Sequence, residues 1–196
     1  MQKAAFGIIR RLAAVSLTAA ILLCTASCGG KKTVASSVSS TSPSSAGYRE
    51  YLGEYAYDLP SACMVWEPVE GEKDESGNPV YGIQYREIKD LDKLLASTDT
   101  AFLLYFHASV YGEDGGITAV VEELAERLAG KVTVVTLDAG EFNDMIGKYE
   151  IKLLPEFVLH ASGKQDMVFG ASERESWTMQ EVADWLDANG YSMNGG

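Results

Sequence analysis

The chain has 196 residues, of which 46% are hydrophobic, and its 16 lysines and arginines against 28 acidic residues give a formal net charge of −12. This apolar fraction is typical of a globular core and excludes a chain that is disordered throughout. The net negative charge argues against nucleic-acid binding, which depends on lysine and arginine contacts to phosphates. The three cysteines, at positions 24, 28 and 63, exclude a disulfide-rich scaffold and a cysteine-based zinc cluster.

The first 27 residues have the pattern of a secretory signal peptide. Lys3, Arg10 and Arg11 precede an apolar stretch at residues 12–23. That stretch is shorter than the roughly 20 residues that a membrane-spanning helix needs. Small residues follow it, as they do before a signal-peptide cleavage site. Residues 1–27 are therefore predicted to be removed, and the mature protein is predicted to be extracytoplasmic.

The segment TASCGG at residues 25–30 resembles the lipobox of bacterial lipoproteins. That resemblance implies that Cys28 is acylated with palmitate-type chains and becomes the new N-terminus. The protein would then be anchored by lipid to the cell membrane, on its extracytoplasmic face, in a bacterial cell envelope. An ordinary secreted protein cut near Cys28 is the alternative interpretation.

Residues 28–82 fall into two parts of different composition. After Cys28, the segment up to residue 47 is rich in serine, threonine and glycine, which predicts a flexible tether. Residues 48–82 form a tyrosine-rich N-terminal extension, in which a hairpin with a long polar loop at residues 70–79 is predicted. The aromatic residues of this extension are interpreted either as a local core or as a ligand-binding cage.

A regular alternation of strands and helices follows. It predicts strands at residues 80–85, 101–106, 131–138, 157–159 and 167–169, and helices at 91–95, 117–128 and 142–149. A last helix is predicted to open at a capping box formed by Thr178 and Glu181. This order indicates an α/β fold with a mainly parallel sheet, covered on both faces and finished by an antiparallel hairpin. Residues 191–196 are predicted to be a disordered tail.

The segment FLLYFHA at residues 102–108, the helix at 117–128 and the segment IKLLP at 151–155 are together similar to the thioredoxin family. The similarity covers residues 83–190, which are therefore expected to form a thioredoxin-like domain. It implies a central mixed sheet, made of a parallel β-α-β unit and a C-terminal β-hairpin, with helices on both faces. It also implies that Pro155 is the cis-proline of the family.

The same resemblance, continued without a gap from residue 106 to residue 128, places the C-x-x-C redox motif of the family on Tyr111, Gly112, Glu113 and Asp114. Both cysteines of the motif are therefore absent. Disulfide exchange requires a thiolate that attacks sulfur, and neither a phenol nor a carboxylate can form the mixed disulfide. We therefore predict a redox-inactive protein without catalytic residues. The question of an enzyme of another kind stays open at this point.

Other chemistry has little support in the sequence. His107, Glu113 and Asp114 lack the spacing of a metal site, so no metal is expected. His107 and His160 are interpreted as packing residues. No phosphate-binding loop or dinucleotide fingerprint occurs, so no cofactor is expected.

The resemblance implies that an extended protein or peptide partner is held beside the cis-proline. The candidate groove consists of Tyr111, Leu154, Pro155, Glu156 and Gly170. The first hypothesis is therefore a surface lipoprotein that acts as a protein-binding or accessory module.

Two alternatives remain. Cys63 is a free thiol after processing, and it either supports a thiol-disulfide oxidoreductase activity or is a small buried residue. The first of these requires an accessible Cys63 near Pro155, with a lowered pKa. The other alternative is a structural subunit of an envelope complex, with residues 48–90 as its interface.

Overall fold

Residues 47–56, 60–97, 100–109, 117–174 and 176–193 are described by the computed structural model. The predicted signal peptide at 1–27, the acylated Cys28 and all but the last residue of the tether lie outside these residues. None of the described helices is both long enough and apolar enough to cross a membrane.

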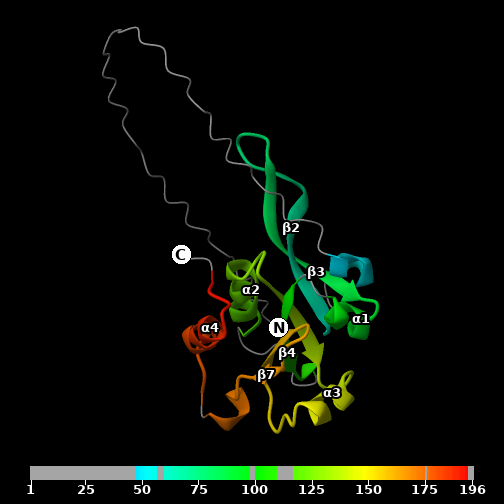
Figure 1. The fold of residues 1–196 in the computed structure, drawn as a ribbon. Coiled ribbons are helices and arrows are strands. Elements are labelled where there is room, and N and C mark those ends of the chain that lie inside the picture. The colour runs from blue at the N-terminus through cyan, green and yellow to red at the C-terminus, as the bar shows by residue number, and fades with distance from the viewer. Residues whose placement is uncertain (1–46, 57–59, 98–99, 110–116, 175, 194–196) are drawn as a thin grey trace, which may run out of the picture. The chain divides into compact units, whose positions relative to one another are not determined.

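The described strands form a single mixed sheet (Figure 1). Its members are β1 (Leu52–Tyr55), β2 (Ala62–Lys73), β3 (Pro79–Ile88), β4 (Ala101–His107), β5 (Val132–Asp138), β6 (Glu156–Ala161) and β7 (Met167–Val168). They lie in the order β1-β3-β2-β5-β4-β6-β7. The buried strand β4, apolar along nearly its whole length, is therefore flanked on both sides, as its sequence predicts.

The prediction of a mainly parallel sheet is wrong. Among the described strands, β4 pairs in parallel with β5, and the other five pairings are antiparallel. The reason is that β2 forms a hairpin with β3 and also lies antiparallel beside β5, while β6 runs antiparallel to β4. The parallel β4-α2-β5 unit and the antiparallel pairing of β6 with β7 agree with the thioredoxin-like arrangement.

Helices cover both faces of the sheet. They are α1 (Leu91–Ala96), α2 (Ile117–Arg127), α3 (Asn143–Lys148) and α4 (Met179–Ala188), with short 3-10 helices η1 (Gly47–Tyr51) and η3 (Ala171–Glu173). Leu103 and Tyr105 of β4 share a buried cluster with residues of α2 and α4. The alternate residues Phe102, Leu104 and Phe106 share a second cluster with α1, against which side chains of α3 pack. This alternation follows from the period of two along a strand.

The tyrosine-rich segment belongs to the same sheet as the rest of the fold. It supplies β1 and β2, and the expected boundary between residues 82 and 83 falls inside β3. Tyr48 is 5% exposed, and its ring meets that of Phe102 edge-on at 5.6 Å between centroids. For Tyr48, therefore, the interpretation as local core is the one that the structure supports.

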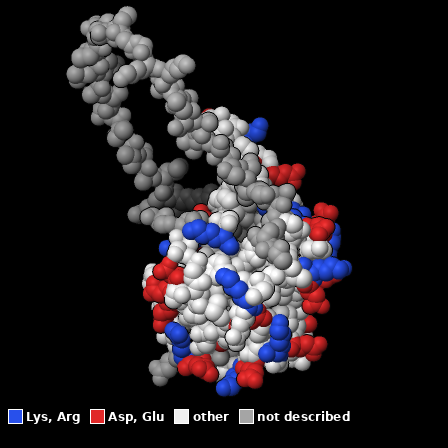
Figure 2. Space-filling model, viewed as in Figure 1, with Lys and Arg blue, Asp and Glu red and all other residues white. Residues whose placement is uncertain are grey.

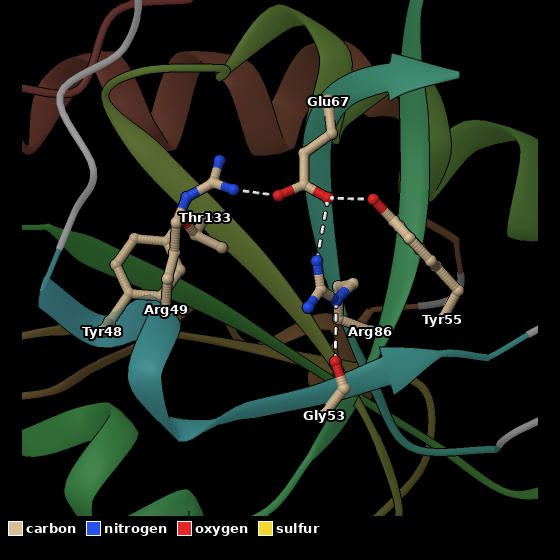
Figure 3. A network of polar contacts seen from close by, with 7 residues as sticks. All are labelled: Tyr48, Arg49, Gly53, Tyr55, Glu67, Arg86 and Thr133. Carbon is tan, nitrogen blue, oxygen red and sulfur yellow. Dashed lines mark hydrogen bonds and ion pairs between the residues drawn. The ribbon is translucent and has the colours of Figure 1, made fainter. Parts of the chain in front are cut away.

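A polar network fastens the N-terminal segment to the sheet (Figure 3). The carboxylate of Glu67 on β2 accepts hydrogen bonds from Arg49 of η1, from the Tyr55 hydroxyl at 3.2 Å and from Arg86 of β3 at 3.2 Å. Arg86 also donates from Nε to the carbonyl of Gly53 at 2.9 Å. Elements η1, β1, β2 and β3 are thus joined through one buried carboxylate.

The two ends of α4 differ in how well the sequence predicts them. At its start, Thr178 and Glu181 form the predicted capping box. After its end, Tyr191 and Met193 pack against the core, and Lys131 Nζ donates to the carbonyl of Ser192 at 2.8 Å. The prediction of a disordered tail is therefore wrong for residues 191–193, whereas 194–196 lie outside the described part of the chain.

Acidic and basic side chains are interspersed over the face of the molecule that Figure 2 draws. The net charge of −12 is therefore not gathered into one acidic field on that face.

Candidate functional site

The loop between α3 and β6 carries a cis peptide bond between Leu154 and Pro155. The resemblance implied this geometry for Pro155. The loop ends directly at β6, which pairs with the central strand β4. Pro155 therefore has a fixed place at one end of the sheet.

A pocket of about 440 Å³ lies beside this bond. One wall is the loop itself, a second is Val120 of α2, and the third is the segment that connects β7 to α4. The lining residues are Val120, Leu153, Leu154, Pro155, Ala171, Arg174, Ser176, Trp177, Thr178 and Met179. Because most of these side chains are apolar, the pocket suits the side chains of an extended peptide.

Aromatic packing supports the pocket from below. The Trp177 ring meets the Phe157 ring edge-on at 4.9 Å, and Phe157 in turn contacts Tyr105 of β4 at 5.1 Å between centroids. Leu153 at the rim is 64% exposed. The pocket thus combines a rigid aromatic base with an exposed apolar side chain at its mouth.

The rim also carries one cation. The Arg174 guanidinium lies 4.4 Å above the centre of the Phe169 ring and pairs with Glu181 at 3.3 Å. Side chains of Arg174 and Glu181 are both well exposed, at 41% and 46%. The Arg174–Glu181 pair is therefore exposed to solvent beside the pocket.

The structure divides the predicted groove residues. Leu154 and Pro155 line the pocket, whereas Glu156 and Gly170 do not. The Glu156 side chain is 1% exposed, and its Oε1 atom accepts hydrogen bonds from the amides of Phe157, Gly170 and Ala171 at 2.9–3.0 Å. Glu156 and Gly170 therefore position the wall of the pocket and do not form its surface.

The fifth predicted groove residue, Tyr111, lies outside the described residues, as do Gly112, Glu113 and Asp114. Their replacement of the C-x-x-C motif is a fact of the sequence and not of the structure.

Eight lining residues are not among the predicted groove residues, namely Val120, Leu153, Ala171, Arg174, Ser176, Trp177, Thr178 and Met179. Six of them lie between the predicted strand at 167–169 and the first turn of the last helix, most of them in a segment where no periodic pattern operates. The one available signal was Trp177, a large aromatic residue directly before the capping box at Thr178.

The carboxyl ends of β4 and β5 form a second polar group. His107 Nε2 lies 2.6 Å from the carbonyl oxygen of Pro60, and Asp138 accepts the Ser109 amide at 2.8 Å. Burial raises the pKa of Asp138, but hydrogen bonds from Ser109 and Gly140 outweigh it and leave the pKa below its ordinary value. Because His107 Nε2 is held by the Pro60 carbonyl group and Asp138 by the Ser109 amide, this arrangement fastens neighbouring segments of the chain to the strand ends.

The second histidine also has a structural place. His160 Nδ1 lies 2.6 Å from Asp166, and Nε2 lies 2.9 Å from the carbonyl oxygen of Leu95. The Tyr149 hydroxyl donates to the same aspartate at 2.9 Å. Within the described ranges, no three His, Cys, Asp or Glu side chains are grouped as metal ligands would be.

Cys63 does not meet the requirements of a reactive thiol. Its side chain is 0% exposed, in a strand that pairs with β3 on one side and β5 on the other. Burial raises the pKa of the Cys63 thiol to about 12. The alternative of an oxidoreductase that relies on Cys63 is therefore wrong, because it required an accessible thiol with a lowered pKa.

The Thioredoxin family model matches residues 83–184. Thioredoxin Y, chloroplastic, from Oryza sativa subsp. japonica is 25% identical over 96 residues, which are 49% of this chain and 57% of that protein. Thioredoxin Y2, chloroplastic, from Arabidopsis thaliana is 32% identical over 73 residues, 37% of this chain and 44% of that protein. This chain thus spans about half the length of these plant relatives.

A smaller relative is covered more fully. The thioredoxin of Rickettsia felis is 26% identical over 96 residues, 48% of this chain and 87% of that protein. Among solved structures, the germline-specific thioredoxin Deadhead from Drosophila melanogaster aligns with a TM-score of 0.40 and 17% identity, over 50% of this chain and 89% of that one.

Proposed function

Because the chain belongs to the thioredoxin family, we propose that it uses the fold of that family as a binding frame and does not carry out its disulfide chemistry. It is a redox-inactive surface lipoprotein, attached to the membrane through acylated Cys28. Its partner is a protein or peptide, which it binds beside Pro155.

One observation supports the proposed loss of redox activity. The sequence has three cysteines, and none stands at residues 111–114, where the family alignment puts the reactive pair. Two of them, at 24 and 28, belong to the leader and the lipobox, and the third is the buried Cys63. Since thiol exchange needs an accessible thiolate, no residue remains to perform it.

The pocket beside Pro155 supports the binding role. Its base is held by packed aromatic rings and by the hydrogen bonds that three backbone amides donate to Glu156. The pocket therefore needs little reorganisation to receive a ligand. The exposed Leu153 side chain gives an extended peptide an apolar contact at the mouth. Backbone and apolar contacts of this kind suit the recognition of an extended segment.

A peptide library displayed on phage and panned against the immobilised full-length chain tests this proposal. Peptides that the chain enriches should be lost with Leu153→Asp, which places a charge at the mouth of the pocket. Val168→Asp is the matched control, because Val168 is an exposed aliphatic residue, at 42%, that does not line the pocket. Equal enrichment by the wild-type chain and by Leu153→Asp would contradict the proposed site.

A further inference from the structure

The outer half of the β2–β3 hairpin extends past the rest of the sheet (Figure 1). Strand β2 pairs with β5 at residues 62–64, whereas its pairing with β3 continues as far as Lys73 and Pro79. Beyond Met64, β2 therefore has β3 as its one described neighbour strand. On one face of this two-stranded part lies α2, which lines a second pocket together with β2 and β3.

Two aromatic rings lie on that face. Trp66 of β2 and Tyr81 of β3 stack with centroids 6.3 Å apart and planes inclined by 25°. Tyr81 is 42% exposed, although it is a large aromatic residue within a strand. Stacked rings with an open face attract cations, because the face of an aromatic ring carries negative charge.

Carboxylates stand opposite the rings. Together with residues of α2, the rings line a pocket of about 400 Å³. We name the surface formed by Trp66, Tyr81, Ile83, Glu122, Glu123 and Glu126 the arm face. It shares no lining residue with the pocket beside Pro155, so the two surfaces are separate.

The three glutamates differ in their present partners. Glu122 accepts a hydrogen bond from the Tyr85 hydroxyl at 2.7 Å, which fixes its orientation. Glu123 pairs with Arg127 at 3.6 Å. Glu126 is exposed, and no cationic side chain pairs with it among the residues that the structure describes. The arm face therefore carries more negative than positive charge.

We propose that the arm face binds an arginine-bearing segment of a partner protein. A guanidinium group is flat enough to stack on the Tyr81 ring while it donates to the carboxylates of Glu122 and Glu126. Charge complementarity selects this occupant over an acidic or a neutral one. The arm face lies partly within residues 48–90, the segment that would be the interface if the protein were a subunit of an envelope complex. The proposal is independent of binding beside Pro155.

An NMR titration of the full-length chain tests the proposal. The probe is the end-blocked peptide Gly-Arg-Gly-Arg-Gly, and its comparison is the same peptide with citrulline, the neutral isostere of arginine. The arginine peptide should shift the Trp66 indole N–H signal and the amide signals of Ala119 and Gly82. Added salt should weaken these shifts, because the contact is electrostatic. Equal shifts with the citrulline peptide would overturn the proposal.

Two variants and a control locate the contact. Tyr81→Leu keeps an apolar side chain but removes the aromatic face, and Glu126→Gln removes one charge. Each should weaken binding of the arginine peptide by about two- to fivefold, the usual range for an exposed cation–π or ion contact. Glu54→Gln, at an exposed residue of β1, should leave binding unchanged. Unchanged binding by both Tyr81→Leu and Glu126→Gln would overturn the proposal.

The predicted tether carries a cationic pair of its own, Lys31 and Lys32. If these lysines occupied the arm face, the double variant Lys31→Gln with Lys32→Gln would bind the arginine peptide more tightly than the wild type. That result would assign the surface to the chain itself and would overturn the choice of a partner protein. Unchanged affinity is the result that we expect.

Discussion

Arg86 of β3 donates a hydrogen bond from Nη1 to Glu67 of β2 at 3.2 Å, and its guanidinium also lies 4.6 Å above the centre of the Tyr55 ring. Glu67 is 5% exposed and also pairs with Arg49 (Figure 3). One carboxylate thus holds two cations and a tyrosine. This relationship makes the N-terminal segment part of the fold that carries both candidate binding surfaces.

Glu67→Ala should lower the free energy of unfolding by about 2–3 kcal/mol. The reason is that it leaves two partly buried guanidinium groups without their counter-charge. Chemical denaturation followed by circular dichroism measures the loss. The control is Asp90→Ala, which removes an exposed ion pair with Lys93 and the Asp90 N-cap of α1, and should cost less than Glu67→Ala because the pair is exposed to solvent. Equal losses in the two variants would show that the buried Glu67 network stabilises the fold no more than an exposed ion pair does.

Cys63 should resist alkylation in the folded protein. Its side chain is fully buried, and its pKa is raised, so both access and thiolate are lacking. Iodoacetamide labelling, followed at the Cys63 peptide by mass spectrometry, should be slow without denaturant and rapid in urea. Rapid labelling in buffer alone would show that the thiol is reachable.

The raised pKa of the Cys63 thiol should make the free energy of unfolding depend on pH. The folded pKa of Cys63 is about 12, above the ordinary value of 9.0. Between these values the unfolded chain binds fewer protons than the folded one, so the free energy of unfolding contributed by Cys63 falls as pH rises above about 9. Below pH 9 the contribution is fully present. Denaturation of the wild type and of Cys63→Ala should therefore give a difference that shrinks from pH 8 towards pH 11, and a constant difference would contradict it.

Glu156→Ala should disturb the pocket beside Pro155 without removing any of its lining side chains. The variant leaves the buried amides of Phe157 and Ala171 and the part-buried amide of Gly170 without their acceptor, at a cost of about 3 kcal/mol. Glu156→Gln keeps an acceptor oxygen and should cost less. Urea denaturation gives the stability, and the NMR signal of the Trp177 indole N–H reports the pocket. Equal losses of unfolding free energy in Glu156→Ala and Glu156→Gln would contradict this account, because Glu156→Gln keeps an acceptor oxygen for the amides.

The sequence predicts the elements of this fold well where periodicity is strong. The apolar run of β4 and the capping box at Thr178 were both predicted and are both present. The mainly parallel sheet was predicted but is not what the described strands form, because β2 pairs antiparallel with β5 across about 70 residues of sequence and β6 pairs antiparallel with β4. Local patterns contain no information about such a long-range choice.

The candidate site was predictable in part. The resemblance identified Leu154 and Pro155, which line the pocket. Glu156 was misplaced because its position in the chain does not reveal that its carboxylate turns inward to three amides. Trp177 was missed because it lies in an irregular segment, where neither the period of a helix nor that of a strand applies.

The insulin-reduction assay on the full-length chain tests the central claim most directly, namely that this thioredoxin-family protein has no thiol pair with which to reduce disulfides. A double variant, Tyr111→Cys with Asp114→Cys, is the positive control, because it places a thiol pair where the sequence resemblance puts the C-x-x-C motif. With dithiothreitol as reductant, the wild type should reduce insulin no faster than dithiothreitol alone, and the double variant should be faster. Reduction above background by the wild type, whether it persists in Cys63→Ser or is lost, would contradict the account.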